Sequence, residues 1–387
     1  MTTGDFLYPI VKGPIKLYYK LALNIKENIN EAKDYKGPLF IIGPHTAEED
    51  SQIAILYRQS LVRFLAADAN WDVGWKSNVF KLFNVIPIAR QRLDVKAIRK
   101  LKSTVEQGHS VGLFPEGQRT WDGKTMDIIK STAKLVKLLK VPVYNINYKG
   151  LYLSRPRWAE RNGRRGKVEL DIKQIFSKEE IEKASKDEVL NSMINHLDYN
   201  EFDWQRKAMV SFKGKNRAEY IERLLYKCPE CKSINSFWSK GDEFSCDKCN
   251  AKYSVNEFGF IEGCKKFDNT VDWHEWQKPA VRELAKKGFS FKQIDIQIER
   301  VYDDGLIKEN ADIVFNNSGL DISFKSGEKQ FIPIEKAQSC NAVYGDRVEI
   351  YFEGIKHRFL FEPLKRHMSV KLFEDLVRYL YNQKIES

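Results

Sequence analysis

The sequence predicts an α/β protein that begins with a mixed, largely parallel sheet flanked by helices. Three observations lead to this fold class. Apolar runs typical of buried strands alternate with helical patterns between residues 39 and 148. Two C-x-x-C pairs follow within residues 228–249, and period-two alternation fills the C-terminal third. We therefore expect a cysteine-rich ribbon after the sheet, and then a small β-barrel or sandwich with a C-terminal helix.

The length and charge of the chain limit what it can be. Its 387 residues suffice for two or three domains, and 64 Lys and Arg against 53 Asp and Glu give a net charge of +11. This balance indicates an anionic partner, either nucleic acid or a membrane surface. No apolar run approaches the roughly 18 residues of a spanning helix, and the N-terminal residues lack the plan of a signal peptide. We expect a cytoplasmic protein, or one attached to the cytoplasmic face of a membrane.

Residues 5–34 mix apolar and aromatic side chains with lysines. Gly13 and Pro14 predict a break between a short helix and a longer one. A segment of this composition can lie in a lipid interface, and it can equally pack on its own domain. The periodicity does not decide between these two possibilities.

The next elements place polar residues at the ends of strands. We expect strands over 39–42, 85–88, 111–114 and 141–148, with helices from about 47, over 95–107 and over 126–139. In parallel sheets covered by helices, sites form at the carboxyl ends of the strands. Each strand ends in a polar cluster, and the clusters are His45–Asp50, Arg90 with Arg92, Glu116–Arg119, and Tyr148 with Lys149.

The first of these clusters, residues 43–50, joins a buried strand to a helix. Thr46 with Glu49 three positions later fits a capping box, so we expect the helix to begin at Ala47. Asp50 then lies in the first turn, within reach of His45. A histidine held by a carboxylate can take a proton from an attacking hydroxyl. The alternative is a capped helix whose acidic residues lie at its positive end without any chemistry.

The two C-x-x-C pairs consist of Cys228, Cys231, Cys246 and Cys249. Two thiolate pairs at this spacing suit tetrahedral Zn²⁺. Because all four positions are cysteine, no coordination position is left for a substrate, so the zinc should be structural. A zinc ribbon also suits nucleic acid. Aromatic and basic residues interleave there only at Phe237, Trp238 and Lys240, and we expect no nucleic-acid partner.

The C-terminal third carries short runs with apolar residues at every second position, separated by turn residues. It ends in a helical pattern over 368–381. Together with the change of composition around the cysteines, this pattern predicts three domains, at residues 1–215, 216–266 and 267–387.

Four features fall in a fixed order along the first of these domains. They are H-x-x-x-x-D at His45 and Asp50, Arg90 after the second strand, F-P-E-G-Q-R-T at 114–120, and V-P-V at 141–143. This set resembles the 1-acylglycerol-3-phosphate acyltransferase family of glycerolipid acyltransferases over residues 5–212. The resemblance implies that His45 is the general base and Asp50 its orienter. It also implies an acyl-donor site that includes Pro142, and an acceptor-phosphate site formed by Arg90, Glu116, Gly117 and Arg119.

The resemblance further implies an enzyme of phospholipid biosynthesis. It would move a fatty acyl group from acyl-CoA or acyl carrier protein to the free hydroxyl of a lysophosphatidate-like acceptor, giving phosphatidate at an anionic membrane surface. The sequence departs from the family pattern at Pro44, Asn84 and Gln118, and none of these positions carries a charge or transfers a proton. The alternative is a zinc-ribbon scaffold or binding protein with a catalytically silent acyltransferase domain.

The last predicted domain resembles a PH/GRAM-like fold. It has about seven short strands and a terminal helix, and residues 331–336 are similar to the mid-domain turn of that fold. Lysines and arginines do not gather in one of its loops, so we interpret it as a docking or oligomerisation module.

Overall fold

The computed structural model describes residues 2–67, 74–88, 95–159, 163–302, 305–337, 339–342, 345–361 and 368–385. The chain forms two compact units. Unit 1 contains Met1–Pro156 and Arg164–Lys213, and unit 2 contains Arg157–Gly163 and Gly214–Ser387. The division of the chain into three domains stays a prediction.

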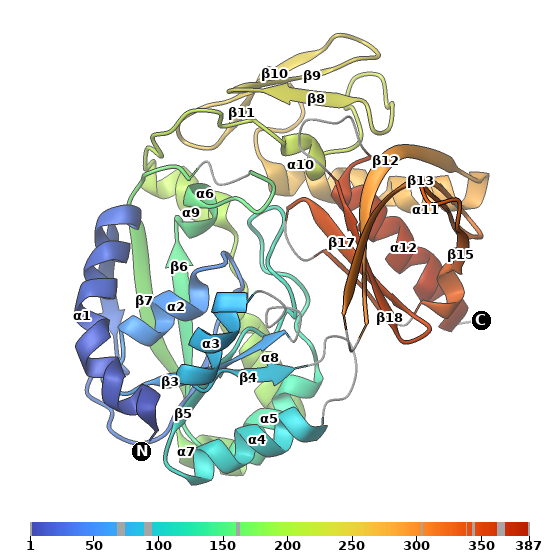
Figure 1. Ribbon diagram of the computed structural model, residues 1–387. Coiled ribbons are helices and arrows are strands. Elements are labelled where there is room, and N and C mark those ends of the chain that lie inside the picture. Colours follow the sequence, from blue (N-terminus) through green and yellow to red (C-terminus); the bar gives the residue numbers. More distant parts are fainter. Residues whose placement is uncertain are drawn as a thin grey trace. The chain divides into compact units, whose positions relative to one another are not determined.

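A seven-stranded sheet forms the centre of unit 1 (Figure 1). Its strand order is β1-β7-β6-β2-β5-β3-β4, and in the described residues every neighbouring pair is parallel except β6 with β7. The mixed, largely parallel sheet is therefore confirmed. The strands are β1 (Ile25–Asn30), β2 (Phe40–Ile42), β3 (Val62–Ala67), β4 (Ile86–Ile88), β5 (Ser110–Leu113), β6 (Val143–Lys149) and β7 (Val168–Phe176).

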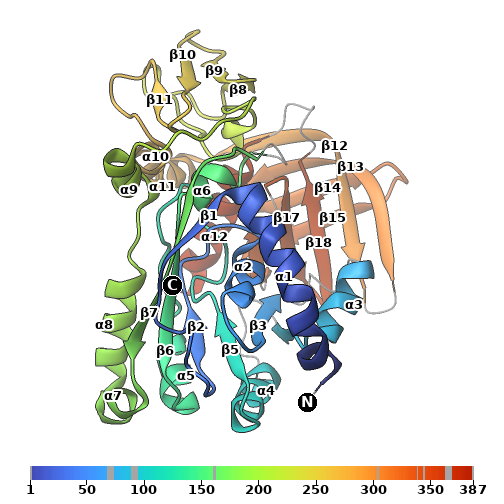
Figure 2. The same cartoon turned by 90° about the vertical axis from the view of Figure 1, so that its left-hand side faces the viewer.

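Apolar layers cover both faces of this sheet, because alternate side chains of a strand point to opposite faces. Ile41 belongs to a core with residues of α1 and α2, whereas Phe40 and Ile42 belong to a second core with α4, α5, α7 and α8 (Figure 2). The helices of unit 1 are α1 (Thr3–Leu23), α2 (Asp50–Leu56), α3 (Gly74–Leu82), α4 (Val95–Glu106), α5 (Ser131–Leu139), α6 (Leu151–Ser154), α7 (Lys178–Lys183), α8 (Lys186–Leu197) and α9 (Glu201–Ala208).

The predicted break at Gly13 and Pro14 is wrong, because α1 continues through both Pro9 and Pro14. Tertiary contacts hold the helix in place. Tyr8 donates its hydroxyl hydrogen to the carbonyls of Ile55 and Arg58, at 2.6 and 2.7 Å. The helical prediction is also wrong for Ile25–Asn30. These residues form β1, which pairs with β7. Among the described helices, none is both long enough and apolar enough to cross a membrane.

The helix α5 begins at Ser131, not at Met126 as the sequence pattern predicts. The preceding residues are held by hydrogen bonds to the loop, and the one from Ile129 takes the place of a helical bond. The backbone N–H of Met126 donates to Glu116, and that of Ile129 donates to the carbonyl of Pro115 at 2.9 Å. Residues 126–130 are therefore part of the loop that follows β5.

Unit 2 contains a small antiparallel sheet with the order β11-β10-β9-β8. Its aromatic side chains Phe237, Phe244 and Tyr253 surround Trp273 of α10, with ring centres 5.2–5.8 Å from the indole. The ribbon therefore shares its core with α10. The elements are β8 (Phe237–Lys240), β9 (Glu243–Cys246), β10 (Lys252–Val255), β11 (Ile261–Glu262), α10 (Thr270–Gln277) and α11 (Pro279–Lys287), preceded by the short 3-10 helix η2 (Ile221–Arg223).

The C-terminal third forms a second, seven-stranded antiparallel sheet in the order β15-β14-β13-β12-β18-β17-β16, followed by α12 (Val370–Ile385). Phe373 of α12 packs against Phe315, Phe359 and Phe361 of the sheet. The strands are β12 (Ser290–Val301), β13 (Leu306–Asn316), β14 (Gly319–Phe324), β15 (Lys329–Pro333), β16 (Ser339–Ala342), β17 (Arg347–Phe352) and β18 (Ile355–Leu360), with η3 (Ile334–Lys336) after β15. The PH/GRAM-like assignment and the docking role stay predictions.

Candidate active site

The candidate site lies at the carboxyl edge of the sheet in unit 1. The strand β2 runs between β5 and β6 and is parallel to both. His45 follows β2, Glu116 follows β5, and Tyr148 lies near the end of β6. The strand order therefore brings together residues that are as many as 98 positions apart along the chain.

His45 and Asp50 form a direct contact. Nδ1 of His45 lies 2.9 Å from Oδ2 of Asp50, and the two side chains are 25% and 0% exposed. When Asp50 is ionised, it accepts the Nδ1–H hydrogen of His45, and that tautomer leaves the lone pair of the imidazole on Nε2. The two residues are thus arranged as a general base and the group that orients it.

The turn between β2 and α2 is held by Asp50, and the predicted capping box is wrong. The Asp50 carboxylate accepts the backbone N–H groups of Thr46 and Ala47, at 2.6 and 3.0 Å. The helix consequently begins at Asp50, and its N-cap residue Glu49 makes no capping hydrogen bond through its side chain. Burial raises the pKa of Asp50 to about 8, while the two backbone N–H groups and the positive charge of Arg119 act in the opposite direction.

Glu116 joins the loops that follow β2 and β5. Its Oε1 accepts the backbone N–H of His45 at 2.6 Å, and its Oε2 accepts the backbone N–H of Met126 at 2.7 Å. Burial raises the pKa of Glu116 to about 8, against the effect of these two N–H groups. Both carboxylate oxygens are therefore occupied by backbone donors, so the geometry gives Glu116 a role in positioning His45.

Two aromatic residues complete the surroundings of the pair, and one of them, Tyr148, lies in a polar cluster that the sequence places at a strand end. The ring of Phe114 stacks on the His45 imidazole, with ring centres 4.6 Å apart and an interplanar angle of 16°. The buried Tyr148 donates its hydroxyl hydrogen to the backbone carbonyl of Asp50 at 2.5 Å. Phe114 belongs to the F-P-E-G block and Tyr148 ends a predicted strand, but no sequence signal showed that they contact the pair.

The remaining predicted site residues are Gly117, Arg119, Arg90 and Pro142. Gly117 is exposed, with a φ of +74° that favours glycine, and Arg119 is half-buried two residues further on. Arg90 lies outside the described residues. Pro142 precedes β6 and its carbonyl accepts the backbone N–H of Phe40 at 2.9 Å. Pro142 is therefore at the amino edge of the sheet, opposite His45. Its role in binding the acyl donor stays a prediction.

Replacing Glu116 by Gln should reduce the fall of stability with rising pH by the contribution of one proton. Folded protein keeps a proton on Glu116 up to about pH 8, whereas an ordinary glutamate releases it near 4.5. Between these values the folded state binds the extra proton, so its free energy of unfolding falls as pH rises. The slope is about 1.4 kcal/mol per pH unit for one proton. Because Gln cannot ionise, the variant loses this contribution.

Urea unfolding between pH 5 and about 8 measures this slope. The exposed Glu106→Gln on α4 is the matched control and should keep the wild-type slope. Equal slopes in wild type and Glu116→Gln would contradict a proton held on Glu116 in the folded state.

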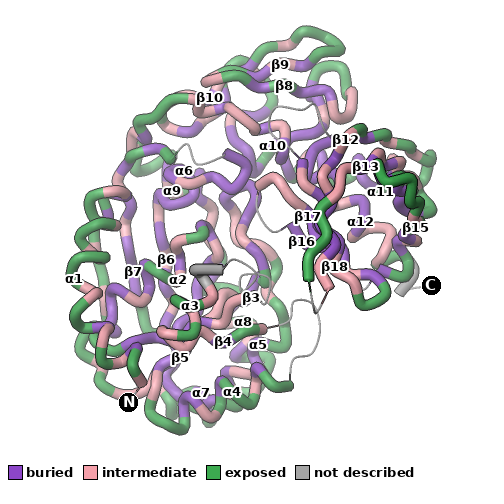
Figure 3. The backbone as a smooth tube through the Cα atoms, in the orientation of Figure 1, coloured by how far each residue is buried: buried purple, intermediate pink, exposed green. Residues whose placement is uncertain are grey.

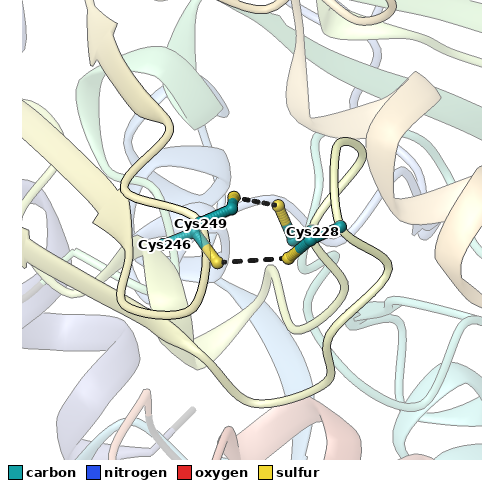
Figure 4. Close-up of side chains that lie close together, drawn as sticks. Cys228, Cys246 and Cys249 are labelled. Atoms are coloured by element: carbon teal, nitrogen blue, oxygen red, sulfur yellow. Dashed lines mark hydrogen bonds between the residues drawn. The ribbon is translucent and has the colours of Figure 1, made fainter.

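A second candidate site, in unit 2, is a cluster of four thiols. One sulfur from each of Cys228, Cys231, Cys246 and Cys249 lies within 4.8 Å of the other three. The Sγ atoms of Cys228 and Cys249 lie 3.7 Å apart, and so do those of Cys231 and Cys246 (Figure 4). Four sulfurs bound to one zinc at about 2.3 Å in a tetrahedron would lie about 3.8 Å apart. The cysteines therefore fit a Zn²⁺ ion.

The comparisons with known proteins identify the class of the first unit. Residues 20–149 match the model of the Acyltransferase family, so the chain contains an acyltransferase domain, and the His45–Asp50 pair lies within it. No curated protein matches the chain.

Three solved structures show what the chain is similar to. One is the 1-acyl-sn-glycerophosphate (LPA) acyltransferase PlsC from Thermotoga maritima, with 19% identity, coverage of 51% of this chain and 80% of that chain, and a TM-score of 0.43. Another is the N-terminal PH domain of human ARAP2, with 12% identity, 25% and 82% coverage and a TM-score of 0.19. The third is the C-terminal domain of an unknown protein from Leishmania infantum, with 11% identity, 27% and 96% coverage and a TM-score of 0.18.

Proposed function

We propose that the protein transfers a fatty acyl group from acyl-CoA or acyl carrier protein to the free hydroxyl of a lysophosphatidate-like glycerophospholipid. The observation that carries this proposal is the 2.9 Å contact between His45 and Asp50 inside an acyltransferase domain. His45 takes the proton of the acceptor hydroxyl as its oxygen attacks the thioester carbonyl carbon. The C–S bond then breaks, and the leaving thiolate receives that proton.

The acceptor would be oriented by its phosphate. Arg119 lies close enough to Asp50 for its positive charge to lower the pKa of that carboxyl. An arginine fork matches phosphate oxygens, and a fixed phosphate places the reacting hydroxyl against His45. Arg90 is the second residue that we propose for this role. The rival function, a zinc-ribbon scaffold with a silent domain, does not explain why the His45–Asp50 contact is intact.

The acceptor and donor are tested by incubating wild type with lysophosphatidate and either acyl-CoA or acyl carrier protein. Arg119→Gln should raise KM for lysophosphatidate by roughly tenfold or more, because a charge-assisted hydrogen bond contributes about 1.5–3 kcal/mol. A monoacylglycerol, which lacks the phosphate, is the control acceptor and should react equally with both proteins. An equal loss with both acceptors would contradict a phosphate-binding role for Arg119.

We further propose that α1 holds the enzyme on the cytoplasmic face of an anionic membrane. Its exposed side chains Phe6, Ile10, Leu17, Tyr18 and Leu21, each 57–69% exposed, form one stripe at helical spacing. Exposed and intermediate residues make up most of this helix (Figure 3). The other side is fixed to unit 1 by Tyr8 and by the Asp5–Arg63 ion pair, which is 2.9 Å long. A fixed helix with an apolar stripe flanked by lysines suits a lipid interface.

Replacing Phe6 and Leu21 by Ser should weaken binding to anionic vesicles at least tenfold. Each large apolar side chain contributes about 1.5–3 kcal/mol when fully buried, and less at an interface. Vesicle co-sedimentation measures the loss. The matched control is Ile194→Ser with Met209→Ser. Ile194 lies on α8 and is 45% exposed, and Met209 follows the last residue of α9 and is 52% exposed. If the two double variants bind alike, α1 is not the membrane-binding element.

A further inference from the structure

Three lysines of unit 2 converge on one aromatic ring outside the sites described above. The Nζ atoms of Lys266, Lys232 and Lys227 lie 4.6, 5.0 and 5.1 Å from the ring centre of Trp276. Because all three distances are measured from one centre, any two of these ammonium groups lie within about twice that distance of each other. We call these four residues the lysine–tryptophan cluster.

Acidic side chains compensate little of the positive charge of this cluster, and the Nζ of Lys232 also donates to the carbonyl of Pro229. Within the described residues the cluster forms one ion pair, in which Nζ of Lys227 lies 3.8 Å from Oε2 of Glu283. Glu283 is itself 59% exposed, so water weakens that pair. The face of an aromatic ring attracts cations, but one indole does not neutralise three charges. Lys232 and Lys266 are exposed, whereas the Lys227 side chain is 13% exposed, so two of the three ammonium groups present their charge at an accessible surface.

Two of the three lysines are held in place by the turn that carries Cys228 and Cys231. Lys227 precedes Cys228, and Lys232 follows Cys231. The backbone N–H of Lys232 donates to the carbonyl of Cys228 at 3.0 Å, and the indole N–H of Trp273 donates to the carbonyl of Lys227 at 3.0 Å. The fold that the thiols define thus places two of the three charges beside Trp276.

We propose that the lysine–tryptophan cluster binds a phosphomonoester group. Such a group is compact and carries up to two negative charges, so it can contact several ammonium groups at once. The lysines lie over the indole ring, which obstructs the base stacking that single-stranded nucleic acid would use. The partly buried Trp276, in contact with Phe267 at 5.2 Å between ring centres, offers an apolar floor beside the charges. The phosphomonoester belongs either to a lipid headgroup or to a soluble compound.

The experiment uses the zinc-loaded full chain and two triple variants. The cluster variant carries Lys227→Gln, Lys232→Gln and Lys266→Gln. The control variant carries Lys240→Gln, Lys248→Gln and Lys252→Gln, which removes the same charge from exposed positions elsewhere on the ribbon. Both keep α1 and the site around His45, so acyl transfer to a soluble acceptor stays at the wild-type level. Binding is measured to neutral vesicles containing phosphatidate, to vesicles containing phosphatidylserine, and to inorganic phosphate.

We expect the cluster variant to bind phosphatidate vesicles about a hundredfold more weakly than wild type. At low salt each lysine near an anionic surface contributes about 1 kcal/mol, and three lysines together give a loss of this size. The control variant should lose less than about threefold. Wild type should prefer phosphatidate to phosphatidylserine, because the former headgroup is a monoester and the latter a diester. Binding of inorganic phosphate with the same dependence on the cluster would show a soluble ligand, and its lack would show a lipid headgroup. Equal losses in the two variants, or equal binding of the two lipids, would overturn the proposal.

Discussion

His45→Ala is expected to lower the rate of acyl transfer by roughly 10²–10⁴, the usual contribution of a positioned general base. The imidazole contacts the Asp50 carboxylate at 2.9 Å and stacks on Phe114, so its loss removes the group that takes the hydroxyl proton. The fold should survive, because the His45 side chain is partly exposed and its backbone hydrogen bond to Glu116 is retained. Initial rates with saturating acceptor and donor measure the effect.

The control for this experiment is His196→Ala, which removes an exposed imidazole from α8. Thermal unfolding of both variants verifies that they are folded. A His45→Ala protein that is folded and as active as His196→Ala would exclude His45 as the base. Wild type that is inactive with every acceptor and donor would favour the scaffold function.

Removal of zinc is expected to unfold the ribbon of unit 2. The free energy of binding one structural Zn²⁺ to such cysteines is on the order of 10 kcal/mol, as large as the stability of a whole domain of about 5–15 kcal/mol. The aromatic core of the ribbon also includes Trp273 of α10, so the loss should reach that helix. Chelation, or Cys231→Ala, should therefore increase proteolysis within residues 228–262 and change tryptophan fluorescence.

Metal analysis should give one zinc per chain of wild type. Cys264→Ala removes a thiol that is outside the four-cysteine cluster, so this variant should keep the metal and resist protease like wild type. A metal-free chain with an unchanged proteolysis pattern would mean that the thiols hold the ribbon without zinc.

Much of the fold could be predicted because its signals are local. Short apolar runs and their alternation with helices indicated the parallel sheet, since each strand must be buried on both faces. The spacing of Cys228, Cys231, Cys246 and Cys249 indicated one cluster, because two short turns suffice to bring the thiols together. The order of His45, Asp50 and the block at 114–120 was sufficient for the resemblance to an acyltransferase, and the match over residues 20–149 agrees with it.

Other features were decided by contacts between distant parts of the chain. The helix α1 passes through Pro9 and Pro14 because Tyr8 and Asp5 fix it to residues some 50 positions away, which no local pattern records. Asp50, not Thr46, holds the turn before α2, because its buried carboxyl group accepts the backbone N–H groups of Thr46 and Ala47. Glu116 contacts His45, and Tyr148 contacts Asp50, only because β2 lies between β5 and β6. The sequence alone therefore determined which groups the site contains, whereas the strand order determined which of them meet, because hydrogen bonds between loops depend on distances that only the folded sheet sets.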